Sequence, residues 1–417
     1  MTDCIVIGGG AAGLFAAGVA ASGGLRVQLL EKNEKLGKKL YITGKGRCNV
    51  TNNCPYHEVL KNVPRNPRFL SACMSVFPPA RTMAFFESQG VPLKVERGER
   101  VFPVSDHASD ITAALERFCR AGGVELVRGA AAELLTRDGA MHGVRLADGR
   151  ELLAGRVILA TGGCSYPLTG SDGSGYRLAS AVGHTITPPT GSLVPLEEDG
   201  GWCAQLQGLS LRNIAIRLKD ERGKRVYDDF GELLFTHFGL SGPTVLSASA
   251  HMQAGHQYTL YIDLKPALDN GTLDARILRD FTKYQNKNLA NALVELYPRS
   301  LIPVMIARAG MDPEQKVNAV TRAQRHALME LTKSFPVVIR GKRPVEEAIV
   351  TSGGVSVREI DNRSMQSRLV EGLHFAGELI DVDAYTGGFN LQIAWATGWA
   401  AGRAAAGLPL SDKEESK

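Results

Sequence analysis

The chain opens on an unbroken apolar run. Residues 4–7 read Cys, Ile, Val and Ile, and after three glycines comes a segment of small, uncharged residues from 11 to 21. A short continuous apolar run is typical of a strand buried on both faces, and the small-residue segment predicts a helix. A second apolar run at 27–30 completes a predicted β-α-β unit.

The pattern changes farther along the chain. From about residue 191, short alternating runs such as 214–218 and 258–264 predict strands of a separate β unit. Between 272 and 331 the apolar spacing becomes helical, with prolines at its starts and breaks. Strand-like runs return at 335–339, 355–357 and 373–378, and an apolar segment ending near 405 predicts a last helix.

The turn after the first strand carries glycines in the spacing G-x-G-x-x-G. Gly8 permits the tight turn, Gly10 lets the backbone approach a pyrophosphate, and Gly13 lets the helix pack closely on the strand. We expect the helix N-terminus at Ala11 and Ala12 to face the phosphates. Glu31, at the end of the second predicted strand, is placed to hold ribose hydroxyls, so this region predicts a dinucleotide site.

Two later segments favour FAD over NAD. One predicted strand ends at Thr161 and Gly162, and a second ends at Glu378. Both have the pattern of strands that return to the sheet beneath the flavin of an FAD domain. In two-part flavoproteins such an acid reaches the ribityl chain, and the following helix aims its positive end at the flavin N1/O2 edge. The start of that helix contributes Gly388, Asn390 and Leu391 to the predicted cofactor contacts.

Composition narrows the class of protein. The 417 residues are 44% hydrophobic and 22% charged, which is enough for a large core and two or three lobes. No secretory leader precedes the first strand and no apolar run is long enough to cross a bilayer, so we expect a cytoplasmic protein without a membrane span. The net charge of +5 is mild and dispersed, which favours an anionic cofactor or substrate over nucleic acid.

The seven cysteines are scattered and contain no Cys-x-x-Cys pair, so we expect neither a disulfide framework nor a metal site. Cys48 and Cys54 follow the first unit, where disulfide oxidoreductases keep a redox pair. Their spacing of five intervening residues, against four in those enzymes, makes thiol chemistry an alternative only. No second glycine fingerprint for a nicotinamide is present, so we expect NADH or NADPH to dock transiently as electron donor.

Four long strings carry a resemblance to a known family. They are residues 44–52 (GKGRCNVTN), 162–173 (GGCSYPLTGSDG), 234–243 (LFTHFGLSGP) and 387–392 (GGFNLQ). Across essentially its whole length the chain resembles the bacterial FAD flavoproteins of the YhiN type, which include proteins described as aminoacetone oxidases and as bile-acid 4,6-dienone reductases. The resemblance implies an α/β fold in which a split Rossmann-like FAD domain carries a small β-barrel and a helical insert.

This layout places boundaries on the chain. We expect the FAD domain at 1–190 plus 345–410, the barrel at 191–270 plus 332–344, the helical insert at 271–331 and a flexible tail at 411–417. Further cofactor contacts are expected from a dispersed set of residues: Lys32, Lys38, Gly44, Arg47, Cys48, Asn49 and Ala132.

Three side chains are candidates for proton donation. His237 lies in an aromatic and glycine-rich stretch and either faces the flavin across an interdomain cleft or is a buried structural histidine. Tyr166 and Tyr385 flank the two flavin-proximal turns and either protonate a developing enolate or pack on the ring.

The expected function is an FAD-dependent oxidoreductase in which NADH or NADPH drives reduction of an activated C=C bond. The resemblance implies a small-molecule substrate such as a 3-oxo-4,6-diene bile-acid steroid, free or as its CoA ester. Three alternatives stay open: an amine oxidase that makes hydrogen peroxide, a flavin-binding protein without turnover that assists RNA modification or regulation, and a thiol oxidoreductase. The oligomeric state is not predicted.

Overall fold

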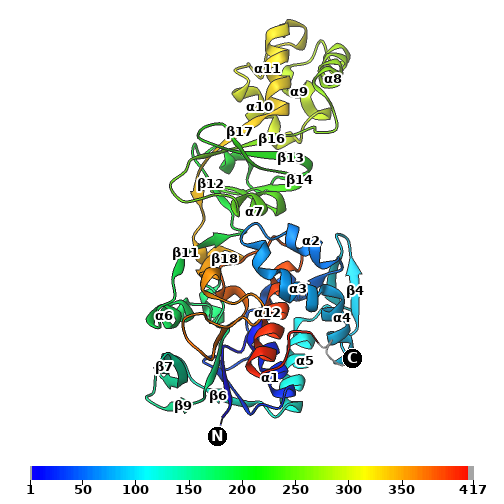
Figure 1. Cartoon of the computed structure of the whole chain (residues 1–417). Helices are drawn as coiled ribbons and strands as arrows, with labels where there is room; N and C mark the ends of the chain where they lie inside the picture. Colours follow the sequence, from blue (N-terminus) through cyan, green and yellow to red (C-terminus); the bar gives the residue numbers. More distant parts are fainter. Residues whose placement is uncertain (1, 412–417) are drawn as a thin grey trace. The chain divides into compact units, whose positions relative to one another are not determined.

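The computed structural model describes residues 2–411 and divides into two compact units, each described by itself (Figure 1). The first unit takes the chain up to Ser192 and again from Val345, and the second is the continuous segment 193–344. The domain boundaries predicted from the sequence are at 190/191 and 344/345. The prediction also divides the second unit into two domains, the barrel and the helical insert. Residues 412–417 of the expected tail lie outside the described residues.

A parallel five-stranded sheet forms the centre of the first unit. Its order is β19 (Leu373–Phe375), β10 (Arg156–Leu159), β1 (Cys4–Ile7), β2 (Val27–Glu31) and β6 (Glu125–Arg128), and every neighbouring pair is parallel. All four residues of β1 are buried, as its unbroken apolar run predicts. Parallel strands need crossover connections, and α1 (Ala11–Ser22) supplies the first of them.

Two long helices pack on α1. These are α5 (Ala108–Ala121) and α12 (Phe389–Ala405), of which α12 is buried over most of its length. The remaining elements of this unit are β3 (Thr51–Asn52), α2 (Tyr56–Lys61), α3 (Ser71–Val76), α4 (Pro79–Ser88), β4 (Leu93–Glu96), β5 (Arg100–Pro103), β7 (Ala131–Arg137), β8 (Ala140–Leu146), β9 (Glu151–Leu153), α6 (Ser174–Ala181), β11 (Ile186–Ser192) and β18 (Val350–Val355).

The second unit contains a closed barrel and a group of helices with a hydrophobic core of their own. The barrel strands, in order around the wall, are β12 (Leu196–Glu198), β15 (Gly239–Ser241), β14 (Arg225–Phe235), β13 (Ser210–Asp220), β16 (Tyr258–Asp263) and β17 (Phe335–Lys342). The helices are α7 (Pro243–Ser249), α8 (Asn270–Lys283), α9 (Leu289–Ala292), α10 (Ile302–Arg308) and α11 (Arg322–Lys333). Alternate residues of β16 are buried, which is the period-2 pattern that the sequence showed.

One predicted strand is misplaced. Of the run 355–357 only Val355 belongs to a strand, which begins at Val350, and residues 357–359 form a 3-10 turn. The glycines at 353 and 354 resemble a turn signal, yet they lie inside a strand paired with β11. A Cβ on Gly354 would stand 2.5 Å from the Leu379 carbonyl oxygen, so close backbone approach, and not a turn, requires glycine here.

Candidate flavin site

The turn between β1 and α1 brings three backbone segments into contact. A Cβ on Gly8, whose φ is +106°, would stand 2.5 Å from the Ala160 carbonyl oxygen, and one on Gly13 would stand 1.8 Å from that of Gly8. Gly10 differs, because a Cβ there meets no atom within 4 Å. Gly8 and Gly13 are therefore needed for packing, whereas Gly10 faces open space of the kind that a phosphate group fills.

Helices α1 and α12 both begin without a side-chain cap and without an acidic residue in the first turn. Their first amide groups are thus available to an anionic ligand. A Cβ on Gly398 would lie 2.9 Å from the Ala12 carbonyl oxygen, and one on Gly402 would lie 2.7 Å from the Ala16 carbonyl oxygen. Because both residue numbers rise together, the two helices run parallel. From this register, α12 begins about 12 Å beyond the start of α1, at 1.5 Å per residue. The two uncapped ends are spaced along one elongated site.

Glu31 closes the end of the site nearest β2. Its buried carboxylate accepts hydrogen bonds from the backbone N–H of Gly9 at 2.6 Å and of Asn33 at 2.7 Å. Lys32, the next residue, pairs with Asp172 at 2.8 Å and so ties the 163–175 loop to this end of the sheet. Lys38 is exposed, as is Ala132 near the start of β7, and contact of either residue with the cofactor stays a prediction.

Glu378 lies in a charged network that follows the carboxyl ends of β10 and β19. One carboxylate oxygen accepts from Lys39 Nζ at 2.6 Å, and the other accepts from Ser165 Oγ at 3.0 Å and from the Thr351 N–H at 2.8 Å. Lys39 also donates to Ser165 at 2.7 Å. Neither Lys39 nor Ser165 is among the residues predicted from the sequence, where the only signal was that Lys39 follows the predicted ligand Lys38 in a basic cluster.

Two hydroxyls beside this network are unsatisfied. Thr161 Oγ1 and the Tyr176 hydroxyl are buried and have no hydrogen-bond partner within residues 2–411. Buried hydroxyls are normally paired, so these two are exceptions to the usual pattern. The open face of Gly10 and the two uncapped helices fit a bound dinucleotide.

The loop 44–52 supports the start of α12. With its side-chain amide turned toward the carbonyls, Asn49 donates to Thr51 and Val101 and accepts from the Gly388 N–H at 3.0 Å. Asn390 fixes the preceding turn, because its amide accepts from the Ala384 N–H at 2.9 Å and donates to the Ala384 carbonyl at 2.7 Å. Both asparagines thus position the α12 terminus. Gly44 and Gly162 adopt positive φ angles of 57° and 75°, and Leu391 packs on the core.

Arg47 lies in the same loop but faces carboxylates. Its guanidinium pairs with Glu96 at 2.5 Å and with Asp106 at 2.8 Å, and it lies over the Phe102 ring. This pairing neutralises the positive charge locally, so contact of Arg47 with a phosphate or with reduced flavin stays a prediction.

The cysteines of the site are poorly suited to thiolate chemistry. Burial raises the pKa of the Cys48 thiol to about 12 and that of Cys54 to about 11. The thiolate, which is the nucleophile, is therefore scarce at neutral pH. All seven cysteines are free thiols.

The three predicted proton donors occupy different surroundings. Tyr385 is partly buried and lies three residues before Gly388, the N-cap residue of α12. Its backbone N–H donates to the Asn62 carbonyl. Tyr166 is exposed and has a left-handed backbone with φ of 52°. His237 is exposed in the turn between β14 and β15, so its alternative assignment as a buried structural histidine is wrong.

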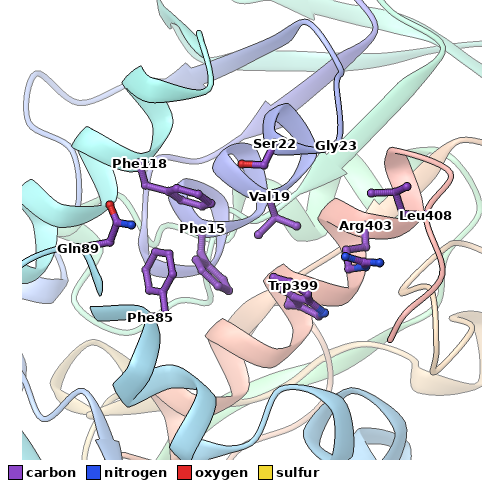
Figure 2. A pocket seen from close by; sticks show the side chains of 10 residues that line it. All are labelled: Phe15, Val19, Ser22, Gly23, Phe85, Gln89, Phe118, Trp399, Arg403 and Leu408. Carbon is purple, nitrogen blue, oxygen red and sulfur yellow. The ribbon is translucent and has the colours of Figure 1, made fainter. Parts of the chain in front are cut away.

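A surface pocket of about 280 Å³ lies at the opposite end of α1 (Figure 2). Val19, Ser22 and Gly23 line it from the last turns of α1, and Phe85, Phe118 and Trp399 surround it. The α1 residues that line it begin at Phe15 and extend to the C-terminal end of the helix, so the pocket does not include the Gly10 turn.

Within residues 2–411, no cluster of three or more His, Cys, Asp or Glu side chains is arranged to hold a metal ion. In the same range, no helix has both the length and the apolar character that a membrane crossing requires.

Comparison with known proteins agrees with this architecture. The model of the HI0933-like protein Rossmann domain matches residues 2–404. A 3-dehydro-bile acid delta(4,6)-reductase of Clostridium scindens is 34% identical over 97% of this chain and 99% of its own length. A ribosomal RNA dihydrouridine synthase of Escherichia coli is 30% identical over 95% and 96%.

A solved structure shares the fold. A 3-ketosteroid delta1-dehydrogenase of Sterolibacterium denitrificans aligns with a TM-score of 0.53 at 14% identity, over 97% of this chain and 99% of that one. The expected fold class, a Rossmann-like FAD-binding domain with a closed barrel and helices, is confirmed. The chain belongs to the HI0933-like family of Rossmann-type, FAD-dependent oxidoreductases.

Proposed function

We propose that this oxidoreductase reduces a C=C bond conjugated to a carbonyl group, with NADH or NADPH as the electron donor. The observation that carries the proposal is the pair of parallel, uncapped helices whose starts are offset by about 12 Å. One terminus suits a pyrophosphate and the other suits the negative charge of a reduced flavin. Bound FAD supplies hydride transfer, and the chain supplies binding, orientation and protons.

The names of the two curated relatives point to one reaction class. A delta(4,6)-reductase acts on C=C bonds of a bile acid, and formation of dihydrouridine saturates the C=C bond of a uracil. In both substrates the double bonds are conjugated to a carbonyl group, so a hydride added to one carbon leaves an enolate that an acid must protonate.

Tyr385 is the proton donor that we favour. It is held by the turn that Asn390 fixes, directly before the uncapped terminus of α12. Tyr166 is more exposed, and His237 belongs to the second unit, so both are secondary candidates for the same role.

Our preferred substrate class is a 3-oxo-4,6-diene steroid, free or as a CoA ester, because the relative with 34% identity is named for such a reduction. A uracil in ribosomal RNA is the second candidate, favoured by the relative with 30% identity. The mild net charge of +5 favours the small molecule, since RNA-binding surfaces are usually strongly basic.

Anaerobic stopped-flow absorbance tests the proposal. The purified yellow protein is mixed with NADH or NADPH, and the reduced protein is then mixed with the steroid dienone, with a ribosomal RNA transcript, or with air. Bleaching by a nicotinamide followed by reoxidation with either enone substrate supports the proposal and identifies the substrate class. Reoxidation by air alone points to an amine oxidase, and lack of reduction by both donors contradicts the proposal.

A Tyr385→Phe variant separates the two half-reactions. We expect reduction by the nicotinamide to be unchanged, and reoxidation by the substrate to slow by about 100-fold or more, as for loss of a general acid. Tyr166→Phe tests the secondary candidate in the same way, and Tyr56→Phe, at an exposed tyrosine of α2, is the control. Equal rates in the Tyr385→Phe and wild-type proteins would reassign the proton donor.

A further inference from the structure

Arg65 is a partly exposed cation in the short segment between α2 and α3. Within residues 2–411 its guanidinium makes one hydrogen bond, from Nη1 to the Asp381 carboxylate at 3.2 Å. The Arg65 side chain is 41% exposed, whereas that of Asp381 is 8% exposed. Since a guanidinium carries five N–H donors, one edge of Arg65 is held by the protein and the remaining donors are available to a ligand.

The carboxylate that holds Arg65 is itself fixed by other donors. Asp381 Oδ2 accepts from Thr187 Oγ1 at 3.0 Å and from Asn66 Nδ2 at 3.3 Å. Asn66 Nδ2 also donates to the Asp381 carbonyl oxygen at 2.7 Å, which anchors the backbone next to Arg65. The guanidinium is thus positioned before a ligand binds, and this reduces the cost of ordering a long side chain in the complex.

The segment that carries Arg65 packs on the turn that leads into α12. Asn62, three residues before Arg65, accepts from the Tyr385 N–H at 3.0 Å. Asp381, the partner of Arg65, lies four residues before Tyr385, so their Cα atoms are at most about 14 Å apart. Two separate contacts therefore place Arg65 in the neighbourhood of Tyr385, the proton donor proposed above, and of the uncapped α12 terminus.

We propose that Arg65 is a substrate-binding residue and that its guanidinium receives the carbonyl oxygen of the conjugated substrate. This assignment rests on the proposed function. A hydride that originates from NADH or NADPH adds to the far carbon of the conjugated C=C bond, and the displaced electron pair leaves a negative charge on the carbonyl oxygen. A proton then adds at a carbon nearer to the carbonyl group, so the C=C bond becomes a single bond. Arg65 stabilises the charged oxygen between these two steps, because a guanidinium remains protonated and offers parallel N–H donors.

Arg65→Gln separates the two half-reactions in anaerobic stopped-flow absorbance. We expect reduction by the nicotinamide to keep its rate, because the substrate oxygen is absent in that step. Reoxidation by the steroid dienone or the RNA transcript, whichever the wild-type protein turns over, should slow by about 100-fold, the effect of losing an oxyanion donor. Arg65→Lys keeps the charge but not the planar fork, so it should recover part of the rate.

Binding of an oxyanion gives a readout that needs no turnover. The probe 4-nitrophenolate carries a negative oxygen on a conjugated ring, as an enolate does, and nitrobenzene is the same ring without this oxygen. Isothermal titration calorimetry of the purified, oxidised protein measures both affinities. We expect Arg65→Gln to raise the dissociation constant for 4-nitrophenolate by about tenfold or more, the effect of losing a hydrogen bond between charged groups, and to leave nitrobenzene binding unchanged.

Arg276→Gln is the matched control, because Arg276 pairs at 3.1 Å with Asp280, whose side chain is 10% exposed. Both variants take an arginine from a shielded aspartate and should lower the melting temperature, but Arg276→Gln should keep the phenolate affinity and the reoxidation rate. Wild-type phenolate affinity in folded Arg65→Gln protein, equal losses in both variants, or no phenolate binding by the wild-type protein overturns the assignment. A wild-type protein that binds phenolate through Arg65 but is reduced by neither nicotinamide contradicts the proposed function alone.

Discussion

At the scale of single residues, an ion pair between two of the protein's own side chains stabilises the candidate site. Lys39 and Glu378 are both largely shielded from solvent and lie 2.6 Å apart, and Ser165 bonds to each of them. A charge-assisted hydrogen bond in such surroundings is stronger than one at the surface. The network therefore holds the acid in a defined position before any ligand arrives.

Thiol chemistry is tested at the residue scale by alkylation. Because burial raises the pKa of Cys48 to about 12, we expect iodoacetamide at pH 7.5 to leave this residue unmodified and the enzyme active. Peptide mass spectrometry after timed labelling measures the modification. Loss of activity in step with labelling of Cys48 or Cys54, or an inactive but folded Cys48→Ser protein, would revive the thiol oxidoreductase.

A second residue-scale prediction concerns stability in acid. Burial lowers the pKa of His374 to about 4, whereas an unfolded histidine titrates near 6.5. Between these values the unfolded chain binds a proton that the native chain excludes, so stability falls as the pH drops from about 6.5 to 4. For a difference of this size we expect His374 to account for about 2–3 kcal/mol of the loss at pH 4.5 relative to pH 7.5.

Urea denaturation at these two pH values measures this effect. A His374→Gln protein, which keeps a donor for the Ser364 carbonyl, should show a smaller difference between them. His237→Gln changes an exposed side chain and should leave the difference as in wild-type protein. The same pH dependence in His374→Gln and wild-type proteins would show that other groups cause it.

At the scale of elements, the contact between α1 and α12 sets the geometry of the site. Glycines at 398 and 402 let the backbone of α12 approach that of α1, although glycine within a helix costs about 1 kcal/mol relative to alanine. The close approach holds the two helices in parallel register. It thereby sets the start of α12 about 12 Å beyond the start of α1.

Gly398→Ala is expected to disturb this register. The added methyl would stand 2.9 Å from the Ala12 carbonyl oxygen, so one helix must shift, at about 1–3 kcal/mol of unfolding free energy. FAD affinity should fall with it, as measured by fluorescence titration. Gly271→Ala in α8, where the nearest atom would lie at 3.6 Å, is the matched control and should keep or raise stability. Equal effects of the two substitutions would contradict this role of the contact.

At the scale of the whole molecule, the second unit is an insertion between two adjacent strands. The chain leaves the first unit after β11 and returns at Val345, and β18 then pairs antiparallel with β11. The chain therefore leaves and re-enters the first unit next to the same two-stranded sheet of β11 and β18. The barrel and its helices have a separate core, so the FAD-binding unit does not depend on them for its own sheet.

We therefore expect the fragment 193–344 to fold alone. It should unfold cooperatively in thermal circular dichroism and show no flavin binding, because every predicted FAD ligand lies in the other unit. A complementary protein, in which a short glycine-serine linker replaces 193–344, should bind FAD and lose turnover of the substrate. A fragment without a cooperative transition would show that the two units fold only together.

The sequence by itself determined the β1–α1 glycine turn, the buried parallel strands, the alternating barrel strands and the family. These features are local: spacing of 2 or 3.6 residues and the few residues that tolerate a tight turn encode them within a short stretch. Reliance on local patterns also explains why β18 was misplaced. Gly353 and Gly354 match a local turn signal, but glycine is required there because backbone atoms of other segments lie close by.

Only the tertiary structure decided which distant residues meet. Lys39 and Glu378 are 339 positions apart, and no local pattern links them. The contacts of Arg47 with carboxylates, the register of α12 on α1 and the orphaned hydroxyl of Tyr176 likewise depend on how separate elements pack. Periodicity specifies the element to which a residue belongs, but burial and hydrogen bonding depend on every element around it, and these are set when the chain is folded.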